Sequence, residues 1–192
     1  MGALPTFRLL LIVVLSLATA SAVPVEGRSF IFSFRRVLNP TLPVPGTKEL
    51  KPDQVNTSGW NKAWTNLVND VEQSFTPSVP QLSAVEVELV VGNVGESQDD
   101  LTLSVKNAAG DELVAVTQIV KTADCEHVLF LLPEGGTEVT PGDLYRIKMS
   151  GGSTFGWKYV AGGYPKGEAT FNGKPLLRQA RSTFLFRTFG SD

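Results

Sequence analysis

The chain has 192 residues, and its 17 basic and 19 acidic side chains leave a formal net charge of −2. A balance this close to neutral supplies no basic surface for a nucleic acid or an anionic membrane, so neither is expected as a partner. The single cysteine, Cys125, cannot form a disulfide within the chain, so we expect stability to come from packing. A buried thiol is the simplest interpretation of Cys125, and a bridge between two chains is the alternative.

The first 22 residues have the pattern of a secretory signal peptide. Arg8 precedes an apolar run from Leu9 to Ala18, and the small residues Ala20 and Ala22 suit a signal peptidase. The apolar run is too short and wrongly flanked for a membrane span. We therefore expect cleavage after Ala22 and a secreted, extracellular protein without a membrane span. An uncleaved anchor is the alternative.

Residues 23–56 are predicted to form an N-terminal strand followed by a proline-rich linker. Phe30, Phe32 and Phe34 alternate as they would on a strand, and the stretch 39–52 contains four prolines with almost no periodicity. The linker ends in Asn56-Thr57-Ser58, which fits the N-glycosylation sequon, a pattern short enough to occur by chance.

A β-sandwich domain is predicted at residues 57–192, opening with one short amphipathic helix. Thr57 or Ser58 would cap this helix, and its apolar residues fall at helical spacing, namely Trp60, Trp64, Leu67, Val68 and Val71. The two tryptophans would then be packing anchors. An irregular segment leading into the first strand is the alternative.

From Val71 onward the sequence predicts short antiparallel strands. In the run Leu82 to Val91, valines and leucines alternate with Glu86 and Glu88, so one face is apolar and the other is charged. Turn signals separate this run from Val71–Phe75, Leu101–Asn107, Leu113–Val120, His127–Leu132, Leu144–Met149, Phe155–Val160, Ala169–Phe171 and Thr183–Phe189. This spacing is typical of an all-β antiparallel sandwich, or jelly roll, of about eight to ten strands.

The order of several short phrases resembles jelly-roll accessory modules of secreted and surface-attached, mostly bacterial, proteins. The similar phrases are 73–76 before a strand, 101–105 with Ala109-Gly110, 139–147, 164–169 and 184–190, and together they cover about residues 70 to 190. The resemblance implies a non-catalytic sandwich, akin to carbohydrate-binding modules, that serves as an accessory or adhesive unit. Such modules usually accompany a larger partner domain.

Aromatic side chains provide the candidate ligand site. Phe155, Trp157 and Tyr159 alternate on one strand face, and Tyr164 lies in the loop that follows. Coplanar aromatic rings stack on the apolar faces of sugar rings. The alternative is that these rings fill the core and that Lys158 faces solvent. The candidate ligand-binding set is Trp157, Tyr159, Tyr164, Lys158 and Arg146.

Acidic residues provide a candidate metal site. Asp99 and Asp100, with Glu96 and Gln98 close by, form a segment rich in the oxygen ligands that Ca²⁺ prefers, so a structural Ca²⁺ is one hypothesis. A solvated acidic turn is the alternative. Further possible ligands near the entry to the domain are Asp53 and Asp70.

Catalysis has little support in the sequence. Cys125 and His127 would share one face of a strand, but the apolar run that follows predicts that this strand enters the core. A glycosidase needs only two suitably spaced carboxylates, which 19 acidic residues leave open.

Three functions therefore remain as hypotheses. The first is a secreted module that binds a glycan or another extracellular surface ligand, which requires Trp157 or Tyr164 to be exposed in a shallow groove. The second is a structural or adhesive unit that packs on a protein partner, with all four aromatic side chains buried. The third is a small glycoside hydrolase or lyase, with two carboxylates facing one cleft.

Overall fold

The computed structural model describes residues 50–178 and 180–191, so the expected signal peptide and the expected strand around Phe32 lie outside the described residues. The one helical segment in the described part is the 3-10 turn η1, Thr122–Asp124. The strands are β1 Lys51–Asn56, β2 Trp60–Asn66, β3 Val71–Phe75, β4 Gln81–Val87, β5 Leu89–Val91, β6 Gln98–Asn107, β7 Glu112–Lys121, β8 Val128–Leu131, β9 Thr137–Glu138, β10 Tyr145–Ser150, β11 Phe155–Ala161, β12 Ala169–Phe171, β13 Lys174–Pro175, β14 Leu177–Arg178, β15 Ala180–Phe184 and β16 Phe186–Ser191. The predicted all-β class is confirmed.

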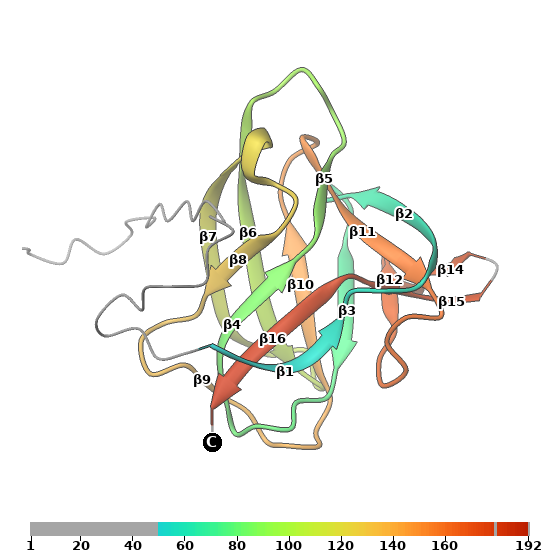
Figure 1. Cartoon of the computed structure of the whole chain (residues 1–192). Helices are drawn as coiled ribbons and strands as arrows, with labels where there is room; N and C mark the ends of the chain where they lie inside the picture. The colour runs from blue at the N-terminus through green and yellow to red at the C-terminus, as the bar shows by residue number, and fades with distance from the viewer. Residues whose placement is uncertain (1–49, 179, 192) are drawn as a thin grey trace, which may run out of the picture.

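The strands form two facing layers, which Figure 1 shows with β4 and β16 in front of β3, β6 and β10. One layer is an antiparallel sheet in the order β13-β12-β3-β10-β6-β7. The other combines β1-β16-β4-β8, with β9 on β4, and β14-β15-β11-β2, with β5 on β11. These two sheets are continuous, because backbone hydrogen bonds join Lys158 to both Glu88 and Leu185, where β4 passes into β5 and β15 into β16. The predicted antiparallel sandwich is therefore confirmed.

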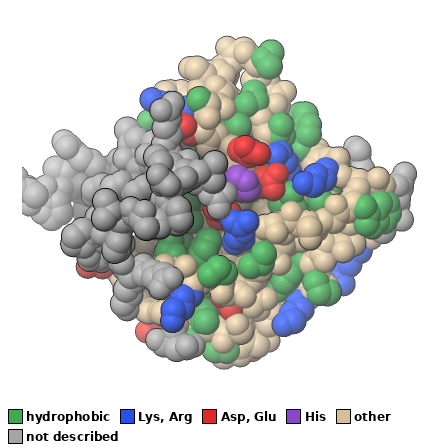
Figure 2. Space-filling model, viewed as in Figure 1, with side chains coloured by type: hydrophobic (Ala, Val, Ile, Leu, Met, Phe, Trp, Pro, Cys, Tyr) green, Lys and Arg blue, Asp and Glu red, His purple; other side chains and the backbone are tan. Residues whose placement is uncertain are grey.

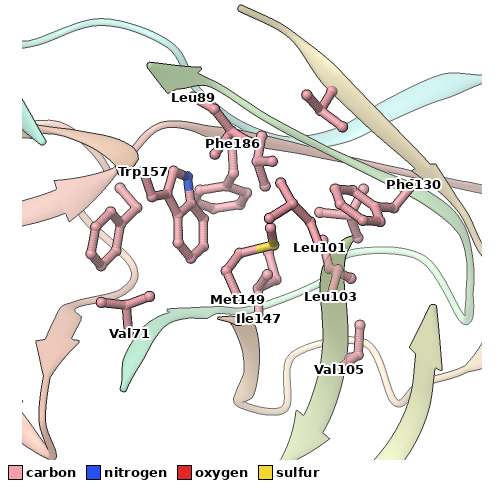
Figure 3. Packing of buried hydrophobic residues seen from close by; sticks show 14 of the residues in the cluster. Val71, Leu89, Leu101, Leu103, Val105, Phe130, Ile147, Met149, Trp157 and Phe186 are labelled. Atoms are coloured by element: carbon pink, nitrogen blue, oxygen red, sulfur yellow. The ribbon is translucent and has the colours of Figure 1, made fainter. Parts of the chain in front are cut away.

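The hydrophobic core lies between the two layers. Along β4, Val85 is fully buried and Glu86 keeps partial exposure, as the alternating pattern predicts. Figure 3 shows Met149 of the facing sheet between Trp157 on one side of the core and Phe130 on the other. Complete burial of a large apolar side chain contributes roughly 1.5–3 kcal/mol, so this core supplies the stability that disulfides do not.

The predicted helix at residues 60–71 is wrong. Residues Trp60–Asn66 form β2, whose Trp64 pairs with Lys158 and whose Thr65 pairs with Trp157 of β11. A spacing of four residues keeps two side chains on one face of a helix, but it also fits the period of a strand. Hydrogen bonds to a neighbouring strand decided the outcome here, and sequence periodicity does not report them.

Strand boundaries also differ from the prediction. Residues 51–56, assigned to the linker segment on sequence grounds, form β1 and pair with β16. The predicted strands 82–91 and 183–189 are each interrupted, at Glu88 and at Leu185, where the chain changes its pairing partner between β11 and the strands β4 and β16. Within the described ranges, no helix is long and apolar enough to cross a membrane.

Candidate functional site

Trp157 is a core residue. Its side chain is 0% exposed, its ring stacks on Phe184 at a centroid distance of 4.3 Å, and its Nε1 donates a hydrogen bond to the Leu185 carbonyl oxygen at 2.9 Å. Tyr159 lies edge-on to the same Phe184 ring and is 2% exposed. The requirement of an exposed Trp157 for sugar stacking is therefore not met, because this face of β11 points into the sandwich.

Tyr164 is also buried, and its contacts are structural. Its hydroxyl donates to Gln54 Oε1 at 2.8 Å and accepts a weak hydrogen bond from the Thr76 amide at 3.4 Å, while its ring packs edge-on against Phe186. Burial raises the pKa of this phenol. Tyr164 thus joins β1 to the core instead of offering an open surface to a ligand, so its predicted exposure in a groove is wrong.

Lys158 and Arg146 lie on different layers and do not meet. Lys158 Nζ is 2.8 Å from Glu88 Oε1 on the outer face of β11. Arg146, on β10 of the other layer, donates to the Ala108 carbonyl oxygen at 3.1 Å and lies 4.0 Å from Glu72. The five residues predicted to bind a ligand therefore do not form one site.

Cys125 and His127 are not paired on a strand, because β8 begins at Val128. Cys125 is buried, and desolvation raises the pKa of its thiol, which disfavours the reactive thiolate. His127 Nδ1 is 3.6 Å from Glu86 Oε1, and Arg187 binds the same oxygen at 2.7 Å. Figure 2 shows the histidine, in purple, among acidic and basic side chains on the outer surface.

The acidic residues of the predicted metal site are already engaged by the protein. Asp99 Oδ2 accepts a hydrogen bond from the Gly152 amide at 2.8 Å, and Glu96 Oε2 accepts one from the Thr154 hydroxyl at 2.5 Å. Asp100 neighbours Asp99 on β6, so the two carboxylates leave opposite faces of the strand. Among the residues that the structure describes, no group of three His, Cys, Asp or Glu side chains is placed to hold a metal ion.

The two further acidic candidates have protein partners as well. Asp53 accepts hydrogen bonds from the amide and hydroxyl of Ser78, and Asp70 Oδ1 lies 2.6 Å from Lys148 Nζ. The hydrogen bond to Asp70 raises the pKa of Lys148. These contacts explain both carboxylates without a bound cation.

The sequon asparagine, Asn56, is 3% exposed. Its Nδ2 donates to Thr183 Oγ1 at 3.1 Å and to the Phe184 carbonyl oxygen. A glycan on this nitrogen would replace one of the two N–H donors, so at least one of these bonds would be lost, and the sugar would have to occupy the packed interior. In the folded chain, Asn56 therefore acts as a buried bridge between β1 and β15.

An open pocket lies at the edge of the sandwich, between the two layers. It measures about 570 Å³ and is bordered by β2 and β11 on one side and by the β12–β13 hairpin on the other. Its lining residues are Trp64, Thr65, Tyr159, Phe171, Asn172, Lys174, Pro175 and Leu176. Of the residues predicted to bind a ligand, Tyr159 alone lies in this lining.

The hairpin side of the pocket is held in place by its own turn. Asn172 and Gly173 both have positive φ values, 49° and 71°, as a tight two-residue hairpin turn requires. The Asn172 amide donates to the Asp70 carbonyl oxygen at 2.7 Å, and the Asp70 amide donates to Asn172 Oδ1 at 3.1 Å. These two bonds anchor the hairpin to the segment that precedes β3, so this wall of the pocket is preformed.

Trp64, on the edge strand β2, borders the pocket and carries an exposed indole on the outer face of its sheet. Its side chain remains 44% exposed, although it packs against the backbone of Gly156 and Gly92. A Cβ on Gly156 would collide with the indole carbon Cε3, and one on Gly92 would lie 3.1 Å from Cζ3. These two glycines therefore make the room that lets the indole lie against the sheet.

Trp60 is the second exposed tryptophan of β2, at 50%. A bulge at Asn61, whose φ is 50°, adds one residue between the two tryptophans, so Trp60 pairs with Ala161 and Trp64 with Lys158. Positions 158 and 161 of β11 lie on opposite faces of the strand. The two indoles therefore do not form one platform, and Trp60 is not part of the pocket lining.

The sequence contained a partial signal for this site. Trp60 and Trp64 are prominent in the sequence, but their helical spacing led to the prediction that they are packing anchors. The glycines that accommodate Trp64 are about 30 and 90 residues away in the chain, so the sequence does not link them to it. Comparison of the chain with models of known protein families and with curated proteins finds no match.

Proposed function

We propose that this protein is a non-catalytic module that binds a glycan at the edge pocket, with a sugar ring reaching over the edge strand β2 to stack on the Trp64 indole on its outer face. The observation that carries the proposal is the 44% exposure of Trp64 beside a preformed pocket of about 570 Å³. Large aromatic side chains are costly to expose, and a half-open indole at a pocket is a common feature of ligand sites.

The composition of the lining supports a sugar over a purely apolar ligand. Phe171, Pro175 and Leu176 offer apolar surface, while Thr65 and Asn172 offer hydrogen-bonding groups. Sugar rings combine apolar faces with a rim of hydroxyl groups, so a pocket of this mixed character matches them.

Placement of the protein outside the cell is part of the same proposal. It rests on the basic residue, apolar run and small residues of the first 22 positions, which are typical of a secretory signal. The resemblance of residues 70 to 190 to accessory modules of secreted proteins supports a role on extracellular glycans.

A second candidate function is a structural or adhesive unit that packs on a protein partner. It is favoured by the burial of all four aromatic side chains at 155, 157, 159 and 164, which that hypothesis requires. The exposed Trp60 and the outer side of β2, the last strand of its sheet in the described part of the chain, would then be the contact surface. A glycoside hydrolase has no comparable support, because the described residues that line the edge pocket include no aspartate or glutamate.

A glycan array tests the proposal with three proteins: wild type, Trp64→Ala and Trp60→Ala. Trp60 is the matched control, since it is the same residue on the same strand, equally exposed but outside the pocket. We expect wild type and Trp60→Ala to retain the same glycans, and Trp64→Ala to lose them while melting at a similar temperature. Loss of retention in Trp60→Ala alone would place the glycan at Trp60 and refute binding at the edge pocket, and no retained glycan in wild type would refute the proposal.

A further inference from the structure

We infer that the edge pocket selects anionic sugars, those carrying a carboxylate or a sulfate, and that Lys174 provides the selectivity. This inference rests on the proposed function, because it assigns a ligand class to the same pocket. Among the described residues that line the pocket, Lys174 is the one charged side chain. These lining residues thus present a positive charge and no carboxylate.

Lys174 is not neutralised by a partner. No ion pair joins it to an acidic side chain in the described part of the chain, whereas Lys106, Lys158 and Arg187 on the sheet faces each lie within 4.0 Å of a carboxylate. A free ammonium group at a pocket is available to a ligand without first breaking a bond within the protein.

Carboxylates close to the hairpin are occupied elsewhere. The backbone of Asp70 is bonded to Asn172 of the hairpin turn, but its carboxylate lies 2.6 Å from Lys148. Glu168, one residue before β12, lies 4.0 Å from Arg181. Because both negative charges have cationic partners, an anionic ligand at the hairpin meets little like-charge repulsion.

The hairpin also fixes where the charge stands. Lys174 pairs in register with Phe171, which lines the pocket, and the Asn172-Gly173 turn between them is anchored as described above. A glycan held between β2 and the hairpin would therefore direct an acidic substituent on its hairpin side toward the Lys174 ammonium. Lysine acts as a mobile point charge, so it accepts either a carboxylate or a sulfate.

The expected selectivity is modest and sensitive to salt, because Lys174 is exposed. A charge pair at an exposed site changes a binding constant by roughly two- to five-fold, so we expect a preference of this size for the acidic sugar. At 1 M salt the screening length is about 3 Å, so the preference should vanish while stacking on Trp64 persists.

The test measures affinity for matched pairs of oligosaccharides. One pair is a uronic-acid oligosaccharide with its carboxyl-reduced form, and the other is a sulfated oligosaccharide with its desulfated form. The proteins are wild type, Lys174→Gln, Trp64→Ala, and Lys166→Gln as a control at an exposed lysine outside the lining. Titration at low and at 1 M salt gives the ratio of affinities within each pair.

We expect wild type and Lys166→Gln to bind the acidic member about two- to five-fold more tightly at low salt, and Lys174→Gln to bind both members equally. The preferred pair tells whether carboxylate or sulfate is the natural group. Equal binding of acidic and neutral members by wild type would overturn the inference and leave the glycan site intact, as would a preference that survives in Lys174→Gln. Failure of wild type to bind any member, acidic or neutral, would count against the proposed function itself.

Discussion

Trp157 and Trp64 lie on adjacent, hydrogen-bonded strands, yet one is 0% and the other 44% exposed. Trp157 pairs with Thr65, and Trp64 is the neighbour of Thr65 on β2. Trp64 therefore faces the opposite side of the sheet from Trp157. Since successive side chains on a strand point to opposite faces, a shift of one residue separates a core anchor from a surface group. Residue type therefore does not identify a binding aromatic in this fold; its position relative to the strand pairing does.

The largest effect should come from removing the buried member of this comparison. Trp157→Ala deletes the stack on Phe184 and leaves the Leu185 carbonyl oxygen without its indole donor, so we expect a loss of about 3–5 kcal/mol in the free energy of unfolding. Trp64→Ala should cost less than about 1 kcal/mol, as exposed positions usually do. Urea denaturation of the two variants measures both values, and similar losses would contradict the assignment of inside and outside.

The second-largest loss of stability should come from substituting the buried polar residue Asn56. Asn56→Ala leaves the Phe184 carbonyl oxygen and the Thr183 hydroxyl without their Asn56 donor, so we expect a loss of about 1–3 kcal/mol. Ser58→Ala is the matched control, because it also destroys the sequon but changes an exposed side chain. Thermal melts of protein made without glycosylation compare them; equal melting temperatures for the two variants would show that Asn56 is not a structural bridge.

The loop carboxylates should show a smaller effect. Asp99→Ala removes the acceptor of the Gly152 amide hydrogen bond, for an expected loss of about 0.5–1.5 kcal/mol. Because Asp99 and Glu96 are already engaged, added Ca²⁺ should not change the melting temperature of wild type. A rise of several degrees with Ca²⁺ in wild type that is absent in Asp99→Ala would establish a metal site here.

The smallest effect is confined to alkaline solution. Burial raises the pKa of Cys125 above its usual 9.0 and that of Tyr164 above its usual 10.0. The folded state therefore holds these protons more tightly than the unfolded chain, so the stability they contribute is present at low pH and is lost as pH rises above about 9. When Cys125→Ala is denatured at a series of alkaline pH values, its free energy of unfolding should begin to decline nearer pH 10 than that of wild type. An unchanged profile would mean that Cys125 does not contribute.

Much of the sandwich was predictable because its strands alternate strictly. Val71–Phe75 and Ala169–Phe171 have the boundaries predicted, and the charged face of β4 follows from Glu86 and its neighbours. The assignment of β2 failed because the four-residue spacing of Trp60 and Trp64 suits a helix, and the bulge at Asn61 that puts the two indoles on opposite faces of the strand leaves no pattern in the sequence. The breaks at Glu88 and Leu185 could not be foreseen, since they mark a change of strand partner and not a change in local pattern.

The edge pocket was less accessible to sequence reasoning. Its walls come from Thr65, Tyr159 and the hairpin at 171–176, segments that approach one another only after the layers pair. The exposure of Trp64 depends on β2 lying at the edge of its sheet and on small residues at 92 and 156, which no local pattern encodes. Trp157, by contrast, looks like a ligand platform in sequence and is a core residue in the fold.

The most direct test of the central claim follows the indole N–H signals of the three tryptophans by NMR while a glycan retained on the array is added. We predict that the Trp64 signal, assigned from Trp64→Phe, shifts in a saturable manner. The Trp157 signal, protected by its hydrogen bond to the Leu185 carbonyl oxygen, should exchange slowly with solvent and remain in place. A glycan that shifts the Trp157 or Trp60 signal and leaves Trp64 unchanged would contradict the account.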